Sequence, residues 1–264
     1  MFRCFYLSIL FMSFFSMCRA QSLINIFDMR QYKAQVKLID EFIARFNRQE
    51  RREDVLDINN DTLQLQLLCD GVRYMSDSVF RNNCDSMILA ILKNDVSLNY
   101  SDLLWYAKAI CDVRYENKND SIEMLLSVEQ RHDDLYKWVI ADVKGDILDL
   151  GAYGRSPELY IMPNQHEMNF MELPKLSKET YKYVVSYTKN SFTYNRLSVF
   201  STMVYLGLLR INIVKSLSFV FMQIPDYCFT VDYFVRDSYN CGWLISDIQK
   251  MTEEQKVELY HMIH

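Results

Sequence analysis

A six-residue pattern occurs twice in the chain, and it constrains the fold more than any other feature of the sequence. The first copy is Trp138 to Val143 (WVIADV) and the second is Trp243 to Ile248 (WLISDI). Both read as Trp, a branched residue, Ile, a small residue, Asp and a branched residue. Each copy comes at the end of a run of segments with strand composition. A pattern that recurs at the same place in two halves favours an internal duplication.

Aromatic and branched residues predict antiparallel strands in each half, because such residues suit a pleated surface. In the first half a hairpin with a polar turn over residues 116–120 is followed by a third strand. In the second half Pro225-Asp226 and residues 237–240 supply the turns. The predicted strands are Leu104–Tyr115, Ser121–Gln130, Tyr136–Val143, Ser216–Met222, Tyr227–Val235 and Cys241–Ile248.

Apolar residues spaced three or four apart predict helices elsewhere. The clearest amphipathic pattern runs from Asp28, a possible N-cap, to Arg48. Thr252 followed by Glu253, Glu254 and Gln255 has the form of a capping box at the start of a closing helix. The other predicted helical segments are Thr62–Cys69, Met75–Phe80, Cys84–Leu92, Lys178–Tyr187 and Leu197–Ile213.

This order of elements resembles the nuclear transport factor 2-like, or SnoaL-like, superfamily, in which a curved sheet wraps around helices to form a cone with an apolar pocket. The resemblance covers Ile26 to Lys144 best and Asn164 to Lys250 more weakly. It implies an α+β fold of two tandem cone-like repeats, each with helices packed on a curved antiparallel sheet. The expected division is a leader at 1–20, a first domain at 21–148 and a more divergent repeat at 149–264. The chain also resembles uncharacterised secreted proteins of Bacteroidota.

The first residues have the composition of an export signal. Arg3 supplies one positive charge, Cys4 to Met17 is an uncharged apolar run, and Ala20 suits a leader peptidase. The apolar run of about 14 residues is shorter than the roughly 20 that a membrane-spanning helix needs. We therefore expect residues 1–20 to be a cleaved signal peptide and the mature chain to be exported, periplasmic or extracellular.

Two alternatives concern the membrane. Cys18 leaves lipoprotein anchoring open, although Met17 is larger than the residue that lipoprotein signals favour before the cysteine. The longest later apolar stretch, Leu197 to Val214, is interrupted by Arg210 and Asn212. We therefore expect no transmembrane segment.

Composition excludes one class of partner and indicates a packed core. Half of the residues are hydrophobic and 14% are aromatic, which favours a folded protein over a disordered one. The formal net charge of −5 gives no basic surface for phosphate groups, so nucleic acid is not an expected partner.

The cysteines indicate no metal site. Outside the leader they number five, and none has the spacing of a zinc or redox motif. They are Cys69, Cys84, Cys111, Cys228 and Cys241. A bridge between Cys69 and Cys84 is possible in an exported protein, and buried free thiols are the alternative. No cofactor is expected, since the sequence has no glycine-rich phosphate loop.

Three residues are candidates for acid–base catalysis. His166 stands beside Glu167 at the start of an apolar stretch. Asp142 and Asp247 each lie four residues after a tryptophan, so on a regular strand each would share a face with that tryptophan and could act as a base with a raised pKa. The alternatives are capping at a loop for the histidine and a solvated strand end for each aspartate.

Aromatic residues suggest a ligand surface. Tyr106, Trp138, Tyr233 and Trp243 lie on predicted strands, and aromatic rings that line a cavity suit sugars, sterols or peptides. Ordinary core packing is the alternative. We expect an exported, non-enzymatic module that binds a small molecule, a glycan or a protein. The alternatives are a small hydrolase or isomerase that uses a pocket His or Asp, and a structural module that forms a homodimer.

Overall fold

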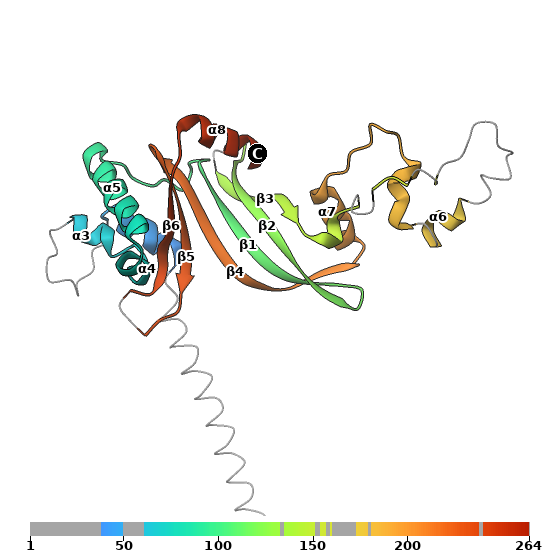
Figure 1. Cartoon of the computed structure of the whole chain (residues 1–264), viewed down its shortest axis with the longest axis horizontal. Helices are drawn as coiled ribbons and strands as arrows, with labels where there is room; N and C mark the ends of the chain where they lie inside the picture. Colours follow the sequence, from blue (N-terminus) through green and yellow to red (C-terminus); the bar gives the residue numbers. More distant parts are fainter. Residues whose placement is uncertain are drawn as a thin grey trace, which may run out of the picture. The chain divides into compact units, whose positions relative to one another are not determined.

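The computed structural model describes residues 38–49, 61–132, 135–150, 154–156, 159, 173–178, 181–237 and 240–263 (Figure 1). These residues contain helices and one six-stranded antiparallel sheet, which confirms the α+β class. The helices are α2 (Ile39–Phe46), α3 (Asp61–Gln66), α4 (Gly71–Ser76), α5 (Ser78–Asn94), α6 (Pro174–Lys178), α7 (Arg196–Tyr205) and α8 (Glu253–Ile263), with 3₁₀ turns η1 (Asp146–Leu148) and η3 (Tyr181–Tyr187). The strands are β1 (Trp105–Tyr115), β2 (Lys118–Gln130), β3 (Tyr136–Lys144), β4 (Leu209–Ile224), β5 (Tyr227–Phe234) and β6 (Gly242–Lys250).

The strands form two meanders that share a single sheet in the order β3-β2-β1-β4-β5-β6. The antiparallel pairing of β1 with β4 joins the meanders, from Trp105 opposite Phe221 to Tyr115 opposite Leu209. Figure 1 shows β1, β2 and β4 side by side and bending along their length. Strands β3 and β6, which carry the two copies of the repeated pattern, are the two edges of the sheet.

Several details differ from the sequence-based expectation. The helices predicted over Met75–Phe80 and Cys84–Leu92 have other bounds, since α4 ends at Ser76 and α5 runs unbroken over Ser78–Asn94, and residues 181–187 of the helix predicted over Lys178–Tyr187 form a 3₁₀ turn. The turn of the first hairpin contains only Glu116 and Asn117, because β2 already begins at Lys118, and Glu116 adopts a left-handed φ of 53°. The helix predicted over Leu197–Ile213 is also wrong in its last part. It ends at Tyr205, Gly207 takes a φ of 69°, and the chain enters β4 at Leu209.

The change from helix to strand in that segment has a tertiary cause. A glycine in the left-handed region commonly ends a helix, since it turns the chain at no steric cost. The residues that follow then pair with β1, with Ile211 opposite Val113 and Arg210 opposite Arg114. Pairing with a long partner strand therefore outweighs the helical spacing of the apolar residues.

The chain divides by packing into two compact units, which are described separately. The first contains Met1–Leu98 and Asp232–Ser246, and the second contains Asn99–Val231 and Asp247–His264. The predicted domain boundary after residue 148 stays a prediction. Residues 28–37 of the predicted first helix lie outside the described residues.

In the second unit, each sheet face is covered by one helix. α7 lies against a cluster that contains Ala109, Cys111, Met124 and Val143, with Phe200 of the helix buried in it. On the opposite face Val220, Met222 and Cys228 contact Met251 and Leu259, which lie just before and within α8. On the same face as the α7 cluster, toward the β2–β3 turn, β3 carries Tyr136, Trp138 and Ile140, which belong to the candidate site.

Two polar devices hold α8 in place. The predicted capping box is confirmed, since the Thr252 amide donates to Gln255 Oε1 at 2.9 Å and the Gln255 amide donates to Thr252 Oγ1 at 3.4 Å. Lys256 is buried, and its ammonium group donates to the Ile224 carbonyl at 2.6 Å and to Glu253 at 2.9 Å. These bonds compensate the charge for the loss of water.

In the first unit, a short segment after α3 adds to the edge of β6. The Ile245 amide donates to the Leu68 carbonyl at 2.8 Å, and the Asp70 amide donates to the Ile245 carbonyl at 2.9 Å. Cys69 and Ile245 thereby form a parallel β-bridge. This part of the β6 edge is therefore occupied by the chain itself.

Side chains fix the docked segment at both ends. Asn240 accepts a bond from the Gly71 amide at 2.8 Å and donates to the Cys69 carbonyl at 2.9 Å. Arg236 forms an ion pair with the buried carboxylate of Asp70 at 2.5 Å. Burial alone would raise the pKa of Asp70, but the bond and charge of Arg236, with the Val72 amide, hold it below its ordinary value.

Replacing Asp70 with Asn tests the ion pair with Arg236, because Asn keeps the side-chain acceptor that caps α4 and removes only the charge. We expect Asp70→Asn to lower the free energy of unfolding at pH 7 by about 1.5–3 kcal/mol, the range for a hydrogen bond to a charged group. Since the folded-state pKa lies below the unfolded one, this contribution is complete above a pH of about 4 and is lost as the pH falls through the folded value. Urea unfolding measures both limits. A difference between the proteins that is the same at neutral and acid pH would contradict the ion-pair account.

Candidate functional site

A row of aromatic rings crosses the sheet of the second unit and ends at the surface. Phe229 of β5 stacks on Phe221 of β4 with ring centroids 5.1 Å apart, and Phe221 stacks on Trp105 of β1 at 5.2 Å. Trp105 meets Trp138 of β3 edge to face at 4.6 Å. The first three rings are buried, whereas Trp138 is 40% exposed. The row thus anchors a half-exposed tryptophan rigidly on the edge strand.

Trp138 belongs to a larger apolar surface. Tyr136, Trp138 and Ile140 alternate along β3 on one face of the sheet, since they pair with Gln130, Val128 and Leu126 of β2. Their exposed fractions are 41%, 40% and 36%, and Leu135 just before the strand is 57% exposed. We call these four residues the β3 patch. Contiguous exposed apolar side chains of this kind mark contact surfaces more often than single ones do.

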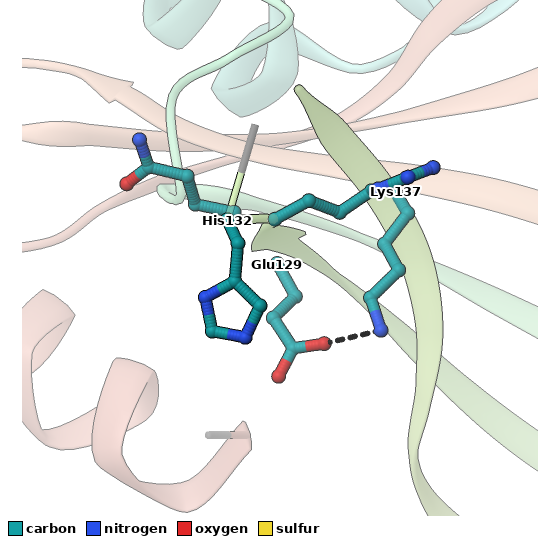
Figure 2. Close-up of a pocket in the computed structure, with 5 residues that line it drawn as sticks. Glu129, His132 and Lys137 are labelled. Atoms are coloured by element: carbon teal, nitrogen blue, oxygen red, sulfur yellow. Dashed lines mark ion pairs between the residues drawn. The ribbon is translucent and has the colours of Figure 1, made fainter. Parts of the chain in front are cut away.

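A pocket of about 670 Å³ lies at the turn end of the β2–β3 hairpin. Its lining residues are Glu129, Gln130, Arg131, His132 and Lys137. Figure 2 shows the Glu129 carboxylate next to the Lys137 ammonium group, 2.9 Å away, with the ring of His132 on the other side of that carboxylate in this view. Lys137 and Glu129 are opposite each other in the ladder, on the face that Trp138 does not share. A charged pocket and the β3 patch therefore lie on the two faces of one hairpin end.

The chemistry of the pocket is that of an open, solvated surface. Glu129 and Lys137 are each about half exposed, and their charges neutralise each other. An ion pair in such a position is worth little, with a usual range of about 0–1 kcal/mol. His132 is exposed as well. Exposed groups of this kind can bind a polar or charged ligand, but only weakly, because water competes for them.

Asp142 does not share a face with Trp138 and Ile140, so that expectation from the sequence is wrong. Ile140 pairs with Leu126 and Asp142 pairs with Leu125, because a β-bulge at this point of the ladder adds one residue to β3. The extra residue turns Asp142 to the other face. Its carboxylate accepts a hydrogen bond from the Val143 amide at 2.8 Å.

The other candidate base on the sheet is Asp247 on β6, and its carboxylate accepts a bond from the Gln249 side chain at 3.0 Å. His166 lies outside the described residues. The structure places Asp142 and Asp247 on the two opposite edge strands of the sheet, and a catalytic role for each of the three candidates stays a prediction.

The four candidate aromatic residues fall into three places. Tyr106 lies on the face opposite Trp138, next to the cluster under α8. Burial raises the pKa of Tyr106 to about 12, so its phenol stays protonated at neutral pH. In the first unit Tyr233 and Trp243 meet edge to face at 5.4 Å. Only Trp138 is both anchored by other rings and part of an exposed patch.

Sequence reasoning missed part of this site. Tyr136 and Ile140 were recognisable as strand residues, but their exposure was not, because it depends on which strand lies at the edge and on how far α7 reaches. Glu129 and Lys137 were recognisable only as polar residues near a turn. Alternation along Tyr136, Trp138 and Ile140 was the one signal that could have revealed the patch.

The described residues offer no set of three His, Cys, Asp or Glu side chains that could hold a metal ion. Within the same part of the chain, none of the helices is long and apolar enough to cross a membrane. No family model, curated protein or solved structure matches this sequence. The resemblance to the nuclear transport factor 2-like superfamily therefore stays a prediction.

Neighbouring residues on β3 should differ sharply in their contribution to stability. We expect Trp138→Ala to lower the free energy of unfolding by about 1–3 kcal/mol, because the ring loses its contacts with the buried row. Lys137→Ala, one residue away on the other face, should change it by less than about 1 kcal/mol. Urea unfolding of the two variants checks this. Equal losses would contradict the assigned faces.

Proposed function

We propose that the chain is an exported, non-enzymatic binding module that captures an extended segment of a partner protein along β3. The main support for this proposal is the β3 patch. Three of its four side chains alternate along an edge strand, and one of these, Trp138, packs against a buried aromatic row. An edge strand offers backbone donors and acceptors to a further strand, and alternate side chains offer specificity.

The other edge of the sheet supports this mode of binding. β6 carries the second copy of the repeated pattern, and there the chain supplies its own extended segment, Leu68–Asp70, in parallel. For β3, the described residues supply backbone bonds only from β2. An incoming strand on β3 would occupy the place that Leu68–Asp70 occupies on β6.

The same comparison supports a tandem duplication. The order β3-β2-β1-β4-β5-β6 reads as two three-stranded meanders related across the β1–β4 pair, with Trp138 and Trp243 near the starts of the two edge strands. We propose that the two halves are repeats whose sheets have merged. In the second repeat a segment of the same chain would then pair with the edge strand β6, and in the first repeat a partner would pair with the edge strand β3.

A binding role is favoured over catalysis by the disposition of the polar groups. An active site needs convergent polar side chains in a cavity from which water is excluded. The bulge directs Asp142 away from the β3 patch, and the pocket at the hairpin end is lined by exposed groups. Aromatic side chains that are rigid and half exposed are the usual anchors of an interface.

Selection of linear peptides of about twelve residues from a phage-displayed library tests the proposal. We expect selected peptides to bind the chain, and we expect Trp138→Ala to weaken their binding at least about tenfold, because it removes the central anchor. Lys137→Ala is the matched control and should leave the affinity within about twofold. The peptide amides form two alternating sets, and methylation of one set should abolish binding whereas methylation of the other should not. The reason is that a paired strand directs only every second amide to its partner. The measurement is isothermal titration calorimetry.

Three results would contradict the proposal. The first is a set of peptides that bind Trp138→Ala as tightly as the wild-type chain. The second is tolerance of methylation at every amide, which would indicate side-chain docking without strand pairing. The third is a wild-type dimer that Trp138→Ala converts to a monomer, since a second copy of the chain would then occupy the edge.

A further inference from the structure

Two buried cysteines of the first unit lie in contact with each other. Cys69, which forms the bridge to β6, and Cys84 in α5 both have no exposed surface. Their side chains are in hydrogen-bonding contact, and this contact, followed by burial, raises the pKa of Cys69 well above its ordinary value. Both residues are free thiols in the structure.

The other cysteines of the described chain are placed differently. Cys111 lies in the cluster under α7, and Cys228 lies in the separate cluster under α8. Cys241 is partly exposed beside Asn240. Cys69 and Cys84 are thus the pair that the structure places in side-chain contact, which favours a bond between them over one with any of these three.

The elements that carry the pair are fixed on both sides. Cys84 belongs to the inward row of α5, with Phe80, Met87, Ile88 and Ile91. Next to it, Asp85 accepts bonds from the Tyr74 hydroxyl at 2.7 Å and from the Gln66 amide at 3.2 Å, which connects α4 and α3 to α5. On the other side Asn240 holds the backbone of Cys69. The segments that carry the two cysteines are therefore held together by bonds on both sides of the pair.

We propose that Cys69 and Cys84 form a disulfide bond when the chain folds in the presence of a disulfide oxidant. In the reaction one protein thiolate attacks the oxidant's disulfide and releases one oxidant thiolate. The second protein thiolate attacks the protein sulfur of the resulting mixed disulfide and releases the other oxidant thiolate. Both protein thiols lose a proton, one S–S bond forms, and the oxidant accepts the two electrons. Because both side chains are inaccessible in the folded unit, the exchange precedes the final packing of α5. The bond would fix the docked segment of β6 to α5, and it is independent of the partner proposed for β3.

The test uses the full chain, refolded from denaturant in a buffer of reduced and oxidised glutathione. Iodoacetamide then labels free thiols in denaturant without a reducing step, and peptides are mapped by mass spectrometry. We expect one peptide pair linked through Cys69 and Cys84, with label on Cys111, Cys228 and Cys241. Label on both Cys69 and Cys84, or linkage of either to a different cysteine, would overturn the proposal.

A thermal measurement supplies a second readout. A disulfide that closes a loop of this length should raise the midpoint of unfolding by about 5–10 °C, and a reductant should remove that increment. Cys84→Ala should show no response to the reductant. Cys111→Ala also removes a buried thiol and is the matched control, so it should keep the full response. A wild-type midpoint that the reductant does not change would overturn the proposal even if a variant failed to fold.

Discussion

The pairing of β1 with β4 is the constraint on which the sheet depends. It joins two meanders that are far apart in the sequence, and it aligns Trp105 with Phe221 so that their rings stack in the core. The same ladder draws residues 209–213 into a strand despite their helical spacing. Because Trp138 rests on Trp105, the most exposed aromatic residue of this row owes its position to a pairing two strands away. The buried rings are already ordered, so holding Trp138 against them costs little further conformational entropy.

The two edge strands of the sheet differ in their backbone pairing, and this difference links the fold to the proposed function. An open edge is a hazard for a folded protein, since it can pair with any extended chain. Leu68–Asp70 pairs with part of the β6 edge. Asn240 binds the Cys69 carbonyl and Arg236 binds the Asp70 carboxylate, which holds this segment in place. The β3 edge instead presents alternating apolar side chains, with Lys137 and Lys144 on the opposite face. Under the proposed function, a partner segment would pair with β3 as Leu68–Asp70 pairs with β6.

Much of the fold could be predicted because most elements have a local signal. Alternation identified the strands of both meanders, and Thr252 with Gln255 identified the start of α8. Three features had no local signal. The bulge that turns Asp142 away depends on the register with β2, the strand character of Ile211 depends on β1, and the exposure of Tyr136 depends on β3 lying at an edge. All three are set by pairing between segments, which the spacing of residues within one segment does not encode.

Amide hydrogen exchange of the unliganded chain tests the central claim, which is that β6 pairs in part with a segment of its own chain whereas none of the described residues pairs with the outer edge of β3. The Ile245 amide, bonded to the Leu68 carbonyl, should exchange at least about a hundredfold more slowly than the amides of β3 that point away from β2, because opening of a paired edge requires local unfolding. Slow exchange at Ile245 together with fast exchange at the outward amides of Tyr136–Lys144 is the predicted result. Equal protection of the two edge strands would contradict the account.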